Sequence, residues 1–159
     1  MKIKDLLRPN ILLLSLFGAG LSPKAPGTVG TLLSIPILLA IGTLIEPRSV
    51  HYSILILTLT IIAAFLADHV QRHTKVHDPS WIVLDEFLGL ALCWPFIDPT
   101  SVREIILIFV LFRFFDIVKI WPASFFDTHI KHGIGTIVDD LISGVYATCS
   151  FLVVKNFFF

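Results

Sequence analysis

Charged residues are scarce in this sequence. Lys, Arg, Asp and Glu make up 15% of its 159 residues, against about 25% in an average soluble domain. Intrinsic disorder is excluded, because disordered chains combine low hydrophobicity with high net charge, whereas this chain is 55% hydrophobic and has a net charge of zero. Twelve basic residues against twelve acidic ones leave no basic excess, so the sequence predicts no nucleic-acid partner.

The sequence motifs of several common kinds of functional site are missing. The two cysteines, Cys93 and Cys149, stand in apolar runs without a C-x-x-C pair or a Cys/His metal spacing. We expect them to pack as small apolar side chains. The sequence contains no GxxxxGK[ST] phosphate-binding loop, no C-x5-R motif and no D-x-D pair. These absences exclude P-loop enzymes and disfavour cysteine-dependent phosphate chemistry.

Long apolar runs, in contrast, are prominent. Residues 29–45 contain no Asp, Glu, Lys, Arg or His, and residues 49–67 contain no Asp, Glu, Lys or Arg. Each is long enough for a membrane-spanning helix of about 17–25 residues. Later apolar runs are shorter and can span only if their helices include neighbouring charged residues. The sequence predicts one membrane-embedded, all-α domain over residues 1–159, a helical bundle of about five spans, expected at 29–45, 50–70, 80–96, 101–119 and 136–154.

Capping signals indicate where the later helices begin. Asp78 followed by Pro79 predicts a helix over about 80–94. Ser101 and Glu104 have the spacing of a capping box, which opens a helix reaching about Lys119. The segment 136–139 resembles the same box and predicts that the last helix carries its two aspartates in the first turn.

The first 20 residues form an amphipathic segment. Basic residues precede the short apolar run 11–17, a pattern shared by signal peptides and by helices lying in the membrane interface. The run is too short to span a bilayer, so we expect an interfacial N-terminal helix.

Basic residues give the five-span scheme a direction. With the N-terminus inside, the inner side receives nine basic residues and the outer side three, which satisfies the positive-inside rule. The inner set is Lys2, Lys4, Arg8, Lys24, Arg72, Lys75, Arg113, Lys119 and Lys131, and the outer set is Arg48, Arg103 and Lys155.

The segment 17–32 is rich in glycine and proline. Its free N–H groups and the hydroxyls of Ser22, Thr28 and Thr31 are suited to holding a phosphate, especially next to a following helix N-terminus. An ordinary loop joined to close helix packing explains the same composition.

Two acidic pairs, Asp85-Glu86 and Asp139-Asp140, share a pattern. Gly89 follows Asp85 by four residues and Gly144 follows Asp140 by four, so each glycine lies one turn from a carboxylate on the same helix face. Glycine lets helices approach closely, so two such helices can bring Asp85 and Asp140 together. Clustered carboxylates near a membrane are costly without a cation, and all-oxygen ligands suit Mg²⁺. The alternative is that these adjacent acidic residues only face the lipid headgroups at the cytoplasmic side of the membrane.

Arg113, Asp116 and Lys119 recur every three residues and share one broad helix face. They can hold a phosphoryl group, with Asp116 orienting the cations or binding metal. Alternatively, they form a charge ladder that reaches toward lipid headgroups. His69, His73 and His77 have helical spacing, but a solvated helix end explains them better than a metal site.

Four motifs in order resemble one known family. They are Gly18-x-Gly-Leu-Ser-Pro-x-x-Pro-Gly-Thr-x-Gly-Thr-Leu32, Ile82-Val-x-Asp-Glu-x-x-Gly89, Phe112-Arg-x-x-Asp-x-x-Lys119 with Trp121-Pro122, and Gly133-x-Gly-x-x-x-Asp-Asp-x-x-x-Gly144. Together they resemble phosphatidylglycerophosphatase A, a bacterial inner-membrane lipid phosphatase, over about residues 17–150.

The resemblance implies Mg²⁺-dependent hydrolysis of phosphatidylglycerol phosphate to phosphatidylglycerol and phosphate. It implies a multi-pass protein of the bacterial inner membrane whose site faces the cytoplasm. The metal ligands it implies are Asp85, Glu86, Asp139 and Asp140, with Arg113, Asp116 and Lys119 as supporting site residues.

Three points stay open in the sequence. The nucleophile is either water or an aspartate. The oligomeric state is undetermined, and a homo-oligomer is compatible with the sequence. A small transporter with an acidic ion site is the alternative from another class, and a lipid-phosphate transferase is disfavoured because its D-x2-D-G-x2-A-R signature is missing.

Overall fold

The computed structural model describes residues 8–76, 78–130 and 132–158, and within them every regular element is a helix. The all-α prediction is therefore confirmed for this part of the chain. The elements in order are α1 (Pro9–Leu14), the short helix η2 (Ala19–Leu21), α2 (Pro26–Leu44), α3 (Val50–Thr74), α4 (Leu84–Cys93), the short helix η3 (Trp94–Phe96), α5 (Val102–Val118), α6 (Ala123–His129) and α7 (Gly133–Phe158).

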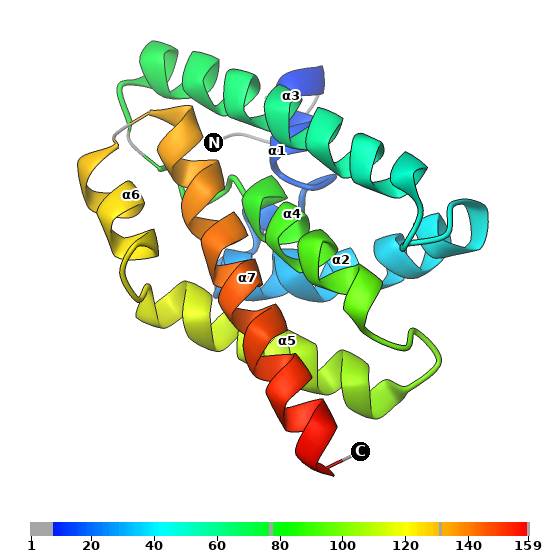
Figure 1. Ribbon diagram of the computed structural model, residues 1–159. Helices are drawn as coiled ribbons and strands as arrows, with labels where there is room; N and C mark the ends of the chain where they lie inside the picture. The colour runs from blue at the N-terminus through cyan, green and yellow to red at the C-terminus, as the bar shows by residue number, and fades with distance from the viewer. Residues whose placement is uncertain (1–7, 77, 131, 159) are drawn as a thin grey trace.

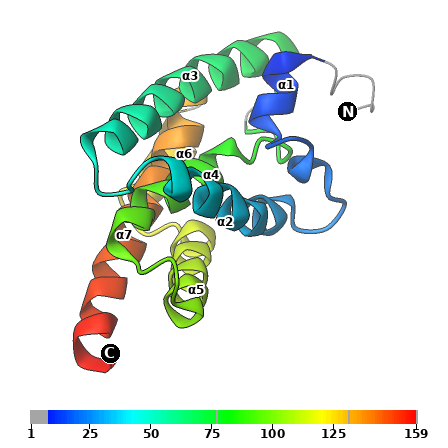
Figure 2. The ribbon, with the colours of Figure 1, turned by 90° about the vertical axis from the view of Figure 1, so that its right-hand side faces the viewer.

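Helix α7 is the centre of the bundle. It packs against α3, α4, α5 and α6, while α2 covers α4 and α1 lies against α3 (Figures 1 and 2). Helix α4 is enclosed by these neighbours, and almost all of its side chains are buried. Its apolar residues Leu88 and Leu90 join Phe112 of α5 and Phe151 of α7 in the core. The position of α4 matters for function, because it carries Asp85 and Glu86 in its first turn.

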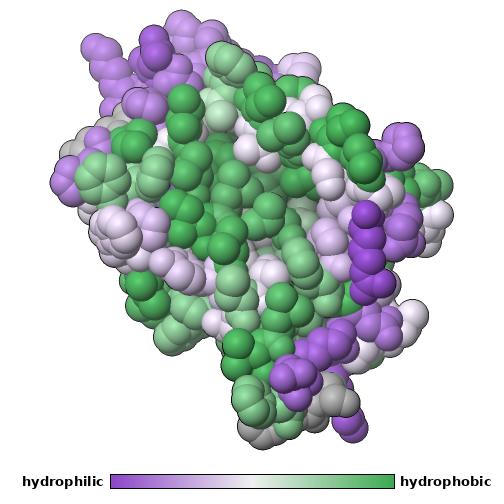
Figure 3. Space-filling view, viewed as in Figure 1, coloured by the Kyte–Doolittle hydropathy of each residue, from purple (hydrophilic) through white to green (hydrophobic). Residues whose placement is uncertain are grey.

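The two ends of the bundle are chemically different from its middle. Exposed apolar side chains cover the intervening surface, for example Leu57 and Phe65 on α3 and Val153 on α7. Figure 3 shows this apolar surface as a broad green area, with hydrophilic residues at the upper left and along the right. Such a surface fits burial in a lipid bilayer.

Three helices are long and apolar enough to cross a membrane: α2, α3 and α7. The predicted count of about five spans is not confirmed. At ten residues, α4 is only about 15 Å long, and α5 carries charged residues near both ends. Even so, the α4–α5 connection reaches the end of the bundle opposite Asp85. There, Lys155 pairs with Glu104 at 2.9 Å, and the Nε atom of Arg48 donates to the Pro95 carbonyl oxygen at 2.9 Å.

Two predicted helix starts are wrong. The Asp78-Pro79 pair does not open α4, which begins six residues after Asp78, at Leu84. The last helix begins at Gly133 and not at Thr136, so Asp139 and Asp140 lie in its second turn. Thr136 has no capping role there, since its hydroxyl accepts a hydrogen bond from Nε2 of Gln71 at 2.8 Å. This contact joins α3 to α7.

The cap at Ser101 is confirmed, but only on one side. The Ser101 hydroxyl accepts a hydrogen bond from the Glu104 N–H at 3.4 Å. The Glu104 carboxylate does not return to the cap. It accepts hydrogen bonds from the Asp98 N–H at 2.8 Å and from Lys155 at 2.9 Å. The ion pair with Lys155 of α7 therefore takes the place of the hydrogen bond that the Glu104 carboxylate would make to the Ser101 N–H in a complete capping box.

The N-terminal segment is described from Arg8 onward. Within α1, Ile11 and Leu14 are buried, and the Leu14 carbonyl oxygen accepts a hydrogen bond from the Val83 N–H at 2.9 Å. These contacts fix the segment ahead of α4. Its predicted place in the membrane interface stays a prediction, and its residues 1–7 lie outside the described part of the chain.

Candidate active site

Close contact between α4 and α7 brings the two acidic pairs together. A Cβ atom on Gly89 would lie 2.7 Å from the Asp140 carbonyl oxygen, a spacing that real side chains do not tolerate. Each glycine stands one helical turn after its aspartate, so the contact sets Asp85 beside Asp140. Carboxylate oxygens of Asp85, Glu86 and Asp140 all lie within 4.8 Å of one another. The sequence hypothesis that glycines allow these carboxylates to meet is confirmed.

The carboxylates line a small cavity of about 240 Å³. It lies where the N-terminal ends of α2 and α4, the C-terminal end of α5 and the second turn of α7 converge. All seven acidic and basic residues predicted for the site line this cavity: Asp85, Glu86, Arg113, Asp116, Lys119, Asp139 and Asp140. Separate sequence motifs thus form one concave site.

Arg113 faces into this site. Its Nη1 atom lies 2.5 Å from Oδ2 of Asp116 and 3.8 Å from Oε1 of Glu86. The same atom donates a hydrogen bond to the Thr31 hydroxyl at 3.4 Å. The side chains of Arg113 and Asp116 are 15% and 11% exposed, so neither reaches toward headgroups. Of the two interpretations of this helix face, the structure favours a site over a surface ladder.

Lys119 makes a second charge cluster beside the first. Its Nζ atom lies 2.6 Å from Asp139 on α7 and 2.6 Å from Asp127 on α6. Burial by itself lowers the pKa of Lys119, but the charges and hydrogen bonds of Asp139 and Asp127 outweigh it and raise that pKa above its ordinary value. Lys119 is therefore a cation in any physiological condition. Asp139 is not among the three carboxylates whose oxygens lie within 4.8 Å of one another.

The glycine-rich segment contributes less to the cavity than its composition predicts. Helix α2 begins at Pro26, so Thr28 and Thr31 are helical. The Ser22 hydroxyl donates to the Lys24 carbonyl oxygen at 2.9 Å. Neither Ser22 nor Thr28 is among the residues that line the cavity, and Thr31 contacts it only through Arg113.

Gly27, in the first turn of α2, is the part of that segment closest to the charges. A Cβ atom there would lie 3.2 Å from Nη1 of Arg113 and would overlap Oε1 of Glu86. Glycine is thus required for α2 to begin against the site. The Pro-Gly-Thr motif is the signal in the sequence that points to this residue.

Two further aspartates belong to the site and were not predicted for it. Asp78 lines the cavity, although its sequence context predicts a helix cap. Asp127 lies on α6, a helix that the apolar pattern did not indicate, and reaches Lys119. Both stand on the predicted inner side of the membrane, and that placement is the signal that could have pointed to them.

The histidines do not line the acidic cavity in the described part of the chain. His69 and His73 lie on α3 with ring centroids 4.4 Å apart and border a separate cavity. The Nδ1 atom of His129 is 2.7 Å from the Thr128 hydroxyl. His77 and Lys131 lie outside the described residues.

Comparisons with known proteins identify relatives of this chain. The model of the phosphatidylglycerophosphatase A family matches residues 12–155. A phosphatidylglycerophosphatase A of Haemophilus influenzae is 35% identical over 90% of this chain and 86% of its own length. One of Escherichia coli is 34% identical over 81% of this chain and 73% of its own length.

A third relative has a different name. A putative phosphatidylinositol-3-phosphatase of Bacteroides thetaiotaomicron is 33% identical over 82% of this chain and 84% of its own length. No solved structure matches the chain. With its motifs gathered in one cavity and its family model matched over nearly the whole length, the chain belongs to the phosphatidylglycerophosphatase A family and is a phosphatase.

Proposed function

We propose that this protein hydrolyses the terminal phosphomonoester of phosphatidylglycerol phosphate, with Mg²⁺ as cofactor, at the cytoplasmic face of the bacterial inner membrane. The observation that carries the proposal is the approach of Asp85, Glu86 and Asp140 to within 4.8 Å, beside Arg113 and Lys119. Family membership favours a phosphatase over the transporter considered from the sequence.

The donor set supports Mg²⁺. Three carboxylates this close repel one another unless a cation or protons compensate them. Oxygen-only ligands are the preferred environment of Mg²⁺. Two carboxylate oxygens, Oε2 of Glu86 and Oδ1 of Asp139, are buried without a hydrogen-bond partner. Asp85, Glu86 and Asp140 would hold the ion, and Asp139 would join them through its unpaired oxygen.

The side chains around this position have separate tasks. Bound Mg²⁺ would supply positive charge and polarise a phosphoryl oxygen. Arg113 binds a second phosphoryl oxygen, and Asp116 orients its guanidinium through the Nη1 contact. Lys119 pairs with Asp139 at 2.6 Å and adds positive charge beside the site. The N-terminal turn of α2, with Gly27 against Glu86, closes the cavity on its remaining side.

The membrane orientation rests on charge. The acidic cavity lies at the end of the bundle that carries Arg113 and Lys119, while Arg48 and Lys155 border a cavity at the opposite end. Nine of the twelve basic residues fall on the inner side of the predicted scheme. A lipid phosphomonoester in the inner leaflet would therefore meet the carboxylates directly.

One relative suggests a second substrate. The name of the Bacteroides thetaiotaomicron protein points to phosphatidylinositol 3-phosphate as its substrate. This lipid and phosphatidylglycerol phosphate contain the same sequence of chemical groups. Each lipid carries a terminal phosphomonoester on a polyol that is joined to diacylglycerol by a phosphodiester. Phosphatidylinositol 3-phosphate is thus the competing substrate to test.

The deciding experiment is phosphate release by the purified full chain in detergent micelles. We expect release from phosphatidylglycerol phosphate with Mg²⁺, its loss in EDTA and its recovery when Mg²⁺ is restored. Asp140→Asn should reduce kcat by about three orders of magnitude, the effect of losing about 4 kcal/mol of transition-state stabilisation. Asp98→Asn at the opposite end is the matched control. Full activity in EDTA or in the Asp140 variant would refute the metal proposal, and faster release from phosphatidylinositol 3-phosphate would change the substrate.

A further inference from the structure

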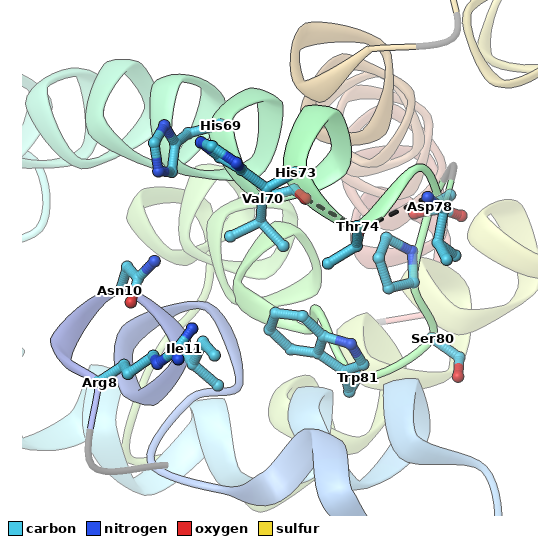
Figure 4. Close-up of a pocket in the computed structure, with 12 residues that line it drawn as sticks. Arg8, Asn10, Ile11, His69, Val70, His73, Thr74, Asp78, Ser80 and Trp81 are labelled. Carbon is cyan, nitrogen blue, oxygen red and sulfur yellow. Dashed lines mark hydrogen bonds between the residues drawn. The ribbon is translucent and has the colours of Figure 1, made fainter. Parts of the chain in front are cut away.

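A second, larger cavity adjoins the acidic one. It lies between α1, the C-terminal third of α3 and the segment 78–81, and its volume is about 910 Å³ (Figure 4). His69 and His73 project into it from α3, and Arg8 and Asn10 border it from the opposite side. Arg8, His69 and His73 are exposed and Asn10 is half-buried, and the phosphatase chemistry proposed above uses none of them.

The two cavities share a wall. Asp78 and Ser80 line both of them, so the short segment between α3 and α4 is their common boundary. The acidic cavity, at about 240 Å³, is smaller than the 300–1,000 Å³ of typical ligand sites. It has room for a phosphoryl group but not for a whole lipid headgroup. The remainder of that headgroup must lie in an adjoining space.

The second cavity has the composition to receive it. Arg8, His69 and His73 provide N–H donors for an anion, and an imidazole can donate such a bond even when neutral. Asp78, at the boundary with the acidic site, is the one carboxylate among the described lining residues. Trp81 forms part of the apolar wall, and tryptophan is typical of sites at headgroup depth.

The sign of the charge separates the two cavities. The acidic cavity needs a cation before it can hold a phosphate, whereas the second cavity offers donors directly. The proposed substrate carries two anionic groups, a phosphomonoester and a phosphodiester, on one short polyol. With the monoester among the carboxylates, the polyol would pass the Asp78–Ser80 wall, and the diester would arrive beside the basic side chains.

We propose that the second cavity binds the phosphodiester of the lipid substrate through Arg8, His69 and His73. This inference rests on the proposed function, since it assigns the remainder of the same headgroup. It makes these three side chains determinants of specificity for lipids that carry both a phosphodiester and a phosphomonoester.

Kinetics of the full chain test the assignment. Arg8→Ala and the double variant His69→Ala/His73→Ala should each raise KM for phosphatidylglycerol phosphate by about tenfold and leave kcat within about twofold, because the lost contact serves binding alone. Phosphatidic acid has a phosphomonoester but no phosphodiester, and its kcat/KM should not change. Arg72→Ala is the matched control, since Arg72 is a neighbouring exposed cation that pairs with Asp68 outside the cavity. An unchanged KM, or an equal loss for phosphatidic acid, would overturn the inference.

A binding measurement keeps the test independent of turnover. Dihexanoyl phosphatidylglycerol contains the diester without the monoester, and it should change the fluorescence of Trp81 in a saturable way. The signal should vanish in Trp81→Phe and weaken in Arg8→Ala, and inorganic phosphate should not reproduce it. An equal response to inorganic phosphate would show a general anion site and overturn the assignment to the lipid. If the wild-type chain releases no phosphate from either lipid, the proposed function fails, while the binding result still decides this inference.

Discussion

The backbones of Gly89 on α4 and Gly144 on α7 are in direct contact. A Cβ atom on Gly144 would lie 2.5 Å from the Gly89 carbonyl oxygen, so a larger residue would force the two helices apart. The Sγ atom of Cys93 fills the same junction, 3.3 Å from the carbonyl oxygens of both glycines. One turn away, Asp85 and Asp140 depend on this spacing for their approach.

Substitution at this contact should damage stability and activity together. Gly144→Val introduces side-chain atoms where the Gly89 backbone lies, and overpacking of this kind costs about 1–3 kcal/mol. We expect a lower thermal midpoint in detergent and loss of phosphate release, because α4 must move away from α7. Gly42→Ala on α2 is the control, since a Cβ atom there meets its nearest neighbour at 3.7 Å. Normal activity in Gly144→Val would mean that the carboxylates do not need this helix contact.

Arg113 should be irreplaceable by lysine. Its Nη1 atom contacts Asp116, Glu86 and Thr31 at once, a geometry that a single ammonium group on a flexible chain does not reproduce. We expect Arg113→Lys to lower kcat by about 100-fold with little change in the thermal midpoint. Arg103→Lys, on an exposed turn of α5 at the opposite end, serves as the control. An equal decrease in both variants would show that the loss is not specific to the site.

Lys119 and Asp139 should behave as a unit. Lys119→Met removes the half-buried partner of the buried Asp139 carboxylate, which should cost about 2 kcal/mol after allowance for the partial exposure of the lysine. In the double variant Lys119→Met/Asp139→Asn no such charge remains, and stability should return while activity does not. Thermal unfolding of the two single variants and the double variant gives the coupling energy. Additive effects would contradict the pairing.

The same ion pair has a defined pH dependence. Because the pKa of Lys119 is higher in the folded chain than its ordinary value of 10.5, its contribution to stability is complete below that value and is lost only as pH rises through the folded pKa. Asp139 is replaced by Asn in both chains so that residue 139 does not titrate. We then expect the difference in unfolding free energy between Asp139→Asn and Lys119→Met/Asp139→Asn, carried by the Lys119–Asp127 pair, to stay constant from about pH 6 to pH 9. A difference that declines within this range would indicate an uncharged Lys119.

The hydrogen bond between Gln71 and Thr136 should stabilise the packing of α3 on α7. Thr136→Val keeps the side-chain shape but removes the acceptor of Nε2 of Gln71, whose Oε1 atom is already buried without a partner. Leaving a buried donor unsatisfied costs about 1–3 kcal/mol, measurable as a lower thermal midpoint. Thr58→Val is the control, since the exposed Thr58 bonds only to its own helix, at the Ile54 carbonyl oxygen. Equal midpoints for wild type and Thr136→Val would exclude a stabilising role for this contact.

Helix positions were predictable where the pattern is local. The uncharged runs located α2 and α3, and Ser101 marked the start of α5, because apolar periodicity and capping act over a few residues. The start of α4 was misplaced. Asp78 has the local signature of a cap, but its segment lies against α1, where the Val83 N–H bonds to Leu14. A tertiary hydrogen bond there overrides the local preference.

The site divides in the same way. The acidic pairs and their glycines were recognisable from spacing, since four residues make about one helical turn. The spacing does not show which acidic residue pairs with which basic residue. From the sequence, Lys119 was free to bind a phosphate, but in the structure it pairs with Asp139 and Asp127. Asp127 lies on the short helix α6, which no apolar run in the sequence predicts.

By itself, the sequence determined an all-helical chain with runs apolar enough for a membrane, because composition and capping patterns are properties of the chain alone, and its ordered motifs resemble a phosphatase family. Only the tertiary structure decided which carboxylates meet and which cations they hold. It also placed a second, polar cavity beside the first. The physical reason is that charge–charge distances depend on helix approach, and here that approach is set by two glycine backbones in contact, far apart in the sequence.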